Sequence, residues 1–191
     1  MQIPELITIV SGLPRSSTSL MMQMLHAGGM PVLTDRIRSP DAANPCGYFE
    51  LEAVKQTRYQ SAWLAEAPQH AVKVIYRLLY DLPADREYHV LFMQRDLAQV
   101  IDSQQVMLGK SLTGNMKRQR LMTIFQKELN ALDSWLKVRS YLHLQPVAHS
   151  QLIHDPIPVI ETIKSFLKYP LDTQAMCRVI DPRLHRQKAA V

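Results

Sequence analysis

The amino-acid sequence predicts an α/β fold built around a mostly parallel sheet. Two short runs rich in branched and aromatic apolar residues, 6–10 and 89–93, have the composition of strands buried on both faces of such a sheet. A turn and then a segment with helical periodicity follow each run, at 18–27 and 97–108. Because strands that alternate with helices pack as a parallel sheet covered by helices, we expect this architecture.

The remaining elements follow from the same patterns. Further helices are predicted over residues 51–67, 117–138, 158–169 and 172–179, and further strands near 71–76 and 141–148. The last strand contains Pro146, which lacks an amide donor, so we expect it at an edge of the sheet. Residues 30–47 and 109–115 are rich in turn formers and are predicted to be long loops.

Length and composition limit the class of protein. The 191 residues suit one domain, which we expect to span residues 1–191. Two cysteines, Cys46 and Cys177, are too few for a disulfide framework or a four-ligand zinc site. The first ten residues lack the basic start of a secretion signal, and no run reaches the about 18 apolar residues of a membrane span. We therefore expect a cytoplasmic protein without a membrane or nucleic-acid partner, whose net charge of +5 suits an anionic small molecule.

The most informative segment is ITIVSGLPRSSTSLMM, residues 7–22, where a buried strand runs through a loop into a helix. Free N–H groups and the positive end of the helix meet there, which creates a site for an anion. Gly12 lets the backbone approach a phosphate closely, and Arg15 adds a planar guanidinium. Four hydroxyl residues follow and add donors: Ser16, Ser17, Thr18 and Ser19. Simple capping of the helix is the alternative interpretation.

This loop differs from the loop of nucleoside triphosphatases. Their pattern would need Gly and Lys at the positions of Ser17 and Thr18. The strand at 89–93 also continues into Gln94 and Arg95 rather than into an aspartate that holds magnesium. The sequence therefore disfavours magnesium-dependent triphosphate hydrolysis.

A second anion-binding candidate follows the strand at 89–93. Arg95 leaves the end of this strand, and Ser103 lies eight residues later, two helical turns on. Ligands of α/β sheets bind beyond the carboxyl ends of strands, so we expect both candidates to face one crevice. Taken alone, this segment also fits a surface pair of Arg95 with Asp96 and an exposed serine.

Together these residues resemble the sulfotransferases that use 3′-phosphoadenosine 5′-phosphosulfate (PAPS). GLPRSSTSL, residues 12–20, is similar to the arginine-bearing 5′-phosphosulfate loop of bacterial members and of tyrosylprotein sulfotransferases. Arg95 and Ser103 match the pair that holds the 3′-phosphate of the donor. NPCGYFE at 44–50 and AHSQLIHDP at 148–156 are similar to further segments of the family. The donor-binding residues implied by the resemblance are Gly12, Pro14, Arg15, Ser16, Ser17, Thr18, Ser19, Arg95 and Ser103.

The resemblance also implies a fold and an activity. The fold would be P-loop-like, with three layers and a mostly parallel central sheet. The activity would be transfer of a sulfuryl group from PAPS to a hydroxyl or amine acceptor, without a metal ion.

The chain departs from the family pattern at several positions. Arg15 stands where small-molecule sulfotransferases have lysine, and Ser17 stands where glycine is frequent. Those enzymes carry a catalytic histidine two residues after a strand lysine, whereas here Lys73 is followed by Val74 and Ile75. Their C-terminal glycine-rich element is not recognisable, and Arg183 or Arg186 are candidates to replace it. His149 stands where a tyrosine is usual.

We expect Arg15 and Glu50 to be the catalytic residues. Related families without the histidine use a glutamate in this region, and Tyr48 and Phe49 could shield the Glu50 carboxylate from water. A first-turn acid at a helix start is the plainer interpretation of Glu50. The other candidate bases are Glu52, Asp35 and His70.

Two other function classes stay open at this point. A P-loop-type nucleoside or nucleotide kinase shares the strand–loop–helix start, and the positive charge suits a non-catalytic nucleotide- or RNA-binding module. Aromatic residues, at 7%, are scarce for a surface that stacks RNA bases. The basic group Lys110, Lys117, Arg118 and Arg120 is either a solvated face or a rim that recruits an anionic acceptor.

Overall fold

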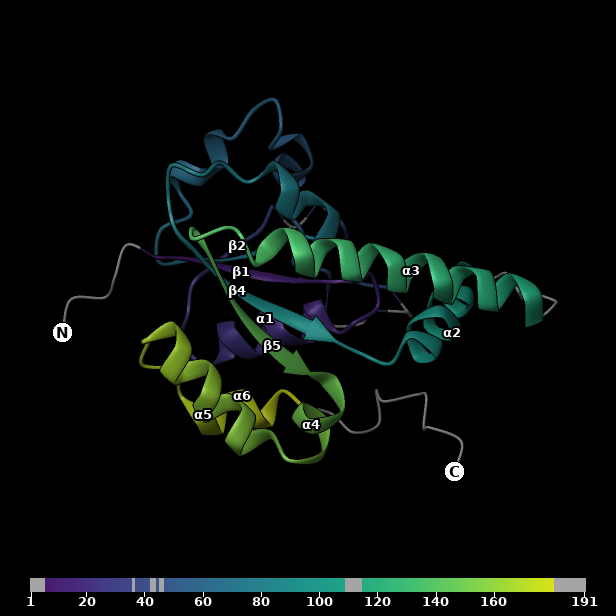
Figure 1. Ribbon diagram of the computed structural model, residues 1–191. Helices are drawn as coiled ribbons and strands as arrows, with labels where there is room; N and C mark the ends of the chain where they lie inside the picture. The colour runs from purple at the N-terminus through teal and green to yellow at the C-terminus, as the bar shows by residue number, and fades with distance from the viewer. Residues whose placement is uncertain (1–5, 36, 42–43, 45–46, 109–114, 181–191) are drawn as a thin grey trace.

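A computed structural model describes residues 6–35, 37–41, 44, 47–108 and 115–180 (Figure 1). Lys110, Arg183 and Arg186 lie outside these ranges. The centre is a five-stranded parallel sheet with the strand order β2-β3-β1-β4-β5. Its strands are β1 (Ile7–Gly12), β2 (Val32–Leu33), β3 (Ala71–Lys73), β4 (Tyr88–Gln94) and β5 (Leu142–Ala148).

Helices cover both faces of the sheet, as Figure 1 shows. They are α1 (Thr18–Ala27), α2 (Leu97–Leu108), α3 (Asn115–Leu136), α4 (His149–His154), α5 (Pro156–Leu167) and α6 (Thr173–Arg178). Buried side chains of α1, α4, α5 and α6 form one core cluster, and those of α2 and α3 join the other. This arrangement confirms the predicted α/β fold with a parallel sheet, and β5 lies at an edge as Pro146 predicts.

Three local predictions are wrong. Residues 51–67 form two 3₁₀-helices, η1 (Glu52–Gln56) and η2 (Ala62–Ala65), instead of one α-helix. Between them the Thr57 hydroxyl donates to the Val54 carbonyl (2.6 Å) and accepts from Trp63 Nε1 (3.0 Å), which offers the chain an alternative to helical bonds.

The other two errors lie at strands. The loop predicted at 30–47 contains the edge strand β2, and the strand predicted at 71–76 ends at Lys73. It gives way to a third 3₁₀-helix, η3 (Tyr76–Asp81). Short edge strands such as β2 lack a sequence pattern of their own because only tertiary pairing defines them.

The topology directs three strand ends to one place. β1 pairs with β3 on one side and with β4 on the other, and Gly12 is level with Met93 while Val10 is level with Lys73. From β1 the chain first builds the β3 side of the sheet and then crosses to the β4 side. Such a switch point opens a crevice at the carboxyl end of the central strand, which here is β1. Among the described residues, no helix combines the length and the apolar composition that crossing a bilayer requires.

Candidate functional site

The loop that joins β1 to α1 has a backbone that only particular residues allow. A Cβ atom on Gly12, whose φ is +148°, would lie 2.5 Å from Ser16 Oγ and 2.8 Å from the Met93 carbonyl oxygen, so only glycine fits there. Arg15 and Ser17 have φ values of 71° and 75°, in the left-handed region that is strained for every residue except glycine. The loop therefore stores strain beside the first turn of α1.

Ser16 supplies an unused donor in this loop. Its side chain is 1% exposed, and its Oγ atom has no hydrogen-bond partner among the described residues. A buried hydroxyl without a partner costs about 1–3 kcal/mol. A bound anion would remove this cost, because its negatively charged oxygen would accept a hydrogen bond from the hydroxyl.

The structure brings the two predicted anion-binding motifs into direct contact. Arg15 Nε donates to Ser103 Oγ over 2.8 Å, and Arg95 Nη1 donates to the Arg15 carbonyl over 3.1 Å. Arg95 Nε also donates to the Gln99 side chain on the first turn of α2 (3.2 Å). Burial, and then the positive charge of Arg15, lower the pKa of Arg95. Two guanidinium groups that repel each other in a partly buried site favour an anion between them.

Lys73 extends this positive site to the end of β3. Its side chain is buried, and its Nζ atom donates to Ser19 Oγ (3.1 Å) and to the Tyr48 carbonyl (2.9 Å). Glu50 Oε1 lies 3.7 Å from the same Nζ atom. Burial lowers the pKa of Lys73 to about 8, although the charge of Glu50 opposes the shift. Lys73 thus fastens the segment around Tyr48 to the start of α1.

Glu50 lies between two cations. Its Oε1 atom is 3.2 Å from Arg38 Nη1 and 3.7 Å from Lys73 Nζ. Arg38 also stacks on the ring of Tyr48, with its guanidinium carbon 3.4 Å from the ring centroid. The Tyr48 ring therefore supports the cation that holds Glu50, and its hydroxyl donates to Asp41 (2.7 Å).

The other candidate bases have different surroundings. Asp35 accepts bonds from the backbone amides of Glu52 (2.5 Å) and Ile37 (3.0 Å), and the Glu52 carboxylate pairs with Lys55 (2.6 Å). His70 precedes β3, at the amino end of the sheet, whereas the site lies at the carboxyl end.

The rest of the predicted set also has a place. His149 is buried at the start of α4, directly after the carboxyl end of β5. The carbonyl of Pro14 accepts a bond from Gln104 Nε2 (3.4 Å), which adds a second link between the loop and α2. Thr18 is the buried first residue of α1. Among the described residues, no group of three or more histidine, cysteine, aspartate or glutamate side chains could hold a metal ion.

Sequence reasoning missed Arg38 and Asn44. The Asn44 amide donates to Ser19 Oγ (3.0 Å) and to the Gly47 carbonyl (2.6 Å), so the first residue of the NPCGYFE segment ties that segment to α1. The similarity of that segment to a sulfotransferase segment was the signal that could have indicated Asn44. Arg38 lies in a loop without periodicity, and no pattern in the sequence indicates its contact with Glu50.

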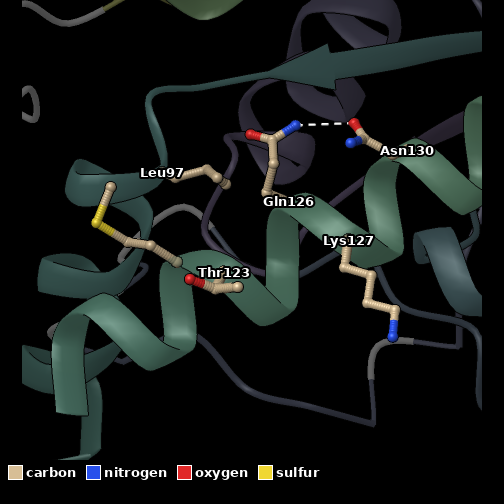
Figure 2. A pocket seen from close by; sticks show the side chains of 6 residues that line it. Leu97, Thr123, Gln126, Lys127 and Asn130 are labelled. Atoms are coloured by element: carbon tan, nitrogen blue, oxygen red, sulfur yellow. Dashed lines mark hydrogen bonds between the residues drawn. The ribbon is translucent and has the colours of Figure 1, made fainter. Parts of the chain in front are cut away.

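An open hollow of about 510 Å³ lies between the start of α2 and the middle of α3 (Figure 2). It is lined by Leu97, Met122, Thr123, Gln126, Lys127 and Asn130. Gln126 Nε2 donates to Asn130 Oδ1 along the α3 wall (2.9 Å). Leu97 lies two residues after Arg95 in the sequence, but no residue of the β1–α1 loop lines the hollow.

Comparison with known proteins supports the fold. No protein-family model and no curated protein matches the sequence. The structure is similar to the sulfotransferase domain of the olefin synthase from Synechococcus PCC 7002, with a TM-score of 0.54 and 17% sequence identity. The match covers 98% of this chain and 85% of that domain. At this identity the likeness concerns the fold, and it confirms the predicted P-loop-like, three-layer α/β architecture.

Proposed function

We propose that this protein is a PAPS-dependent sulfotransferase that moves a sulfuryl group to a hydroxyl or amine acceptor. The observation that carries the proposal is the contact of the two arginine motifs: Arg15 Nε donates to Ser103 Oγ, and Arg95 Nη1 donates to the Arg15 carbonyl. A donor with a phosphosulfate at one side of its ribose and a phosphate at the other needs two adjacent cationic pockets, and these residues can supply both. The sulfotransferase-like fold supports the same activity.

Each part of the site has a role in this proposal. Backbone N–H groups after Gly12, the orphaned Ser16 hydroxyl and the Arg15 guanidinium would bind the 5′-phosphosulfate. Arg95 and Ser103 would bind the 3′-phosphate. These groups would distinguish a nucleotide with a 3′-phosphate from one without it through charge-assisted hydrogen bonds, which contribute about 1.5–3 kcal/mol each.

The chemistry needs charge stabilisation and one proton acceptor. The bond between sulfur and the bridging phosphate oxygen breaks, a bond from sulfur to the acceptor oxygen or nitrogen forms, and 3′-phosphoadenosine 5′-phosphate leaves. The Arg15 guanidinium stabilises the charge that develops on the leaving phosphate. The acceptor proton passes to a base, for which Glu50 is our candidate, since Arg38 and Lys73 hold its carboxylate at the strand ends.

Calorimetry with three nucleotides tests the proposal. We expect 3′-phosphoadenosine 5′-phosphate to bind at least roughly tenfold tighter than AMP, because the 3′-phosphate adds charge-assisted bonds. ATP with magnesium should bind weakly. Equal affinity for AMP and the bisphosphate would overturn the proposal, and hydrolysis or transfer with magnesium-ATP would favour a kinase.

Arg95 offers a sharper version of the experiment. Arg95→Ala should weaken binding of the bisphosphate by about 2 kcal/mol or more, roughly 30-fold, and weaken AMP binding much less. Arg86→Ala is the matched control, since Arg86 Nη1 also donates to a backbone carbonyl, that of Leu64 (3.0 Å), away from the site. Equal losses in both variants would mean that Arg95 has only a structural role.

A further inference from the structure

The end of the α2–α3 hairpin exposes large apolar side chains. Val106 is 74% exposed and Met107 37% near the end of α2, and Met116 is 87% and Ile124 41% exposed on α3. We call these four residues, together with the exposed Lys117 and Arg120, the hairpin tip. Scattered single apolar residues are common on surfaces, but four within three turns of two adjoining helices are a concentration that folding does not require.

The charges of the hairpin tip run against helix stability. Residues 116–127 carry four cations, Lys117, Arg118, Arg120 and Lys127, and no acid. The positive end of the helix dipole lies at this N-terminus, so Lys117 and Arg118 in the first turn destabilise α3, whereas Arg120 and Lys127 lie beyond the reach of this effect. Asp102 on α2 pairs with Arg118 (2.8 Å) and compensates one of them. Lys117 and Arg120 are exposed, so both charges face solvent.

Three residues of the hairpin tip share one face of α3, and Lys127 continues the same row. Met116, Arg120, Ile124 and Lys127 follow each other at steps of four, four and three, which places them on one face of the helix. Apolar and cationic side chains therefore alternate along this face. Long cationic side chains such as Arg120 can lie along apolar surface while their charged ends reach outward, which suits a boundary between apolar material and anionic groups.

The tip also projects from the body of the protein. The 22 residues of α3 span about 33 Å, whereas the seven residues of β4 span about 23 Å. In Figure 1 the ends of α2 and α3 that carry the tip extend beyond the sheet. A flat surface can therefore meet the tip before it meets the rest of the described chain.

We propose that the hairpin tip docks on the surface of an anionic lipid bilayer, with Met116 and Val106 entering the headgroup region and Lys117 and Arg120 contacting lipid phosphates. The sequence alone led us to expect no membrane partner, since exposure and projection of these residues are visible only in the fold. A bilayer accepts separate, protruding apolar side chains whose neighbouring cations reach the headgroups. A protein partner would need a packed, contiguous patch with a central pocket, and the exposed apolar residues of the tip are interrupted by cations. This proposal does not depend on the proposed sulfuryl transfer.

Sedimentation of the full chain with vesicles tests the docking. We expect binding to vesicles of equal parts phosphatidylcholine and phosphatidylglycerol, weaker binding as salt rises, and no binding to phosphatidylcholine alone. The double variant Lys117→Gln/Arg120→Gln should lower the partition coefficient roughly 30-fold. Val106→Ser/Met116→Ser should lower it at least about tenfold, because the bilayer buries these side chains.

The other end of α3 supplies the matched control. Lys137 and Val138, just after this end, are 70% and 73% exposed, so Lys137→Gln/Val138→Ser makes one change of each kind and should leave vesicle binding as it is. An equal loss in this control, equal binding to neutral vesicles, or no binding to either vesicle overturns the proposal. A last measurement uses poly-glutamate. If the protein binds it and the Val106→Ser/Met116→Ser variant binds it equally well, the proposal is overturned in favour of an acidic protein partner.

Discussion

Arg15 and Ser103, which are 88 positions apart in the sequence, form a hydrogen bond of 2.8 Å from Nε to Oγ at the junction of the β1–α1 loop and α2. This bond joins the two segments that would grip opposite sides of an adenosine donor. The orientation of the Arg15 guanidinium therefore depends on a residue of the other segment. Substitutions at the two positions should affect a bound anion together.

A double-mutant cycle measures this dependence. Arg15→Lys and Ser103→Ala should each weaken binding of 3′-phosphoadenosine 5′-phosphate, and their combination should cost less than the sum by about 0.5–3 kcal/mol. The reason is that lysine lacks the Nε donor, so the second substitution has no bond left to break. Calorimetry on the four proteins gives the coupling, and strictly additive losses would show that the two segments act independently.

Ser17→Gly should stabilise the protein by about 1 kcal/mol. Ser17 has a φ of 75° and its side chain does not cap α1, so glycine relieves strain without loss of a hydrogen bond. Urea denaturation monitors the change. Ser61→Gly is the control, since Ser61 also precedes a helix without capping it but has a φ of −108°, and there glycine should lower stability.

Lys73 should make stability depend on alkaline pH. Its pKa is about 8 in the folded protein and 10.5 when unfolded, so between these values the unfolded chain binds more protons and stability rises with pH. The free energy of unfolding should rise by up to roughly 3 kcal/mol as the pH increases from 8 to 10.5. The same contribution is lost as the pH falls back to 8. Below pH 8 both states carry the proton, and the contribution stays absent.

The Lys73→Met variant isolates this contribution from other titrating groups. Denaturation from pH 7 to 10.5 should show the rise in the native protein and not in the variant. Lys137→Met, at a lysine that is 70% exposed, should follow the native protein. A parallel pH profile for the native protein and Lys73→Met would mean that burial does not perturb Lys73.

Glu50→Gln should separate catalysis from donor binding. If its carboxylate takes the acceptor proton, turnover should fall by roughly 100-fold or more, while affinity for the bisphosphate stays within about twofold. Glu52→Gln is the control, because its carboxylate pairs with Lys55 at the surface. A similar turnover for Glu50→Gln and the native enzyme would assign the base to another residue.

Much of this architecture follows from local patterns. The apolar runs of β1 and β4 and the periodicity of α1 and α2 are properties of neighbouring residues, and the structure has these elements within two residues of their predicted bounds. The errors lie where particular side-chain or strand contacts decide: the bond between Trp63 and Thr57, six positions apart, accompanies two 3₁₀-helices in place of one helix. β2 likewise exists only because β3 lies beside it.

The sequence by itself determined β1, α1, β4 and α2, the strand–loop–helix start and the spacing of Arg95 and Ser103, because each depends on a few consecutive residues. Only the tertiary structure decided which side chains meet: Arg15 with Ser103, Lys73 with Ser19, and Arg38 with Glu50. It also decided that Met116 and Val106 stay exposed. These relations join segments that lie far apart in the chain, and packing of the whole sheet and its helices sets their distances.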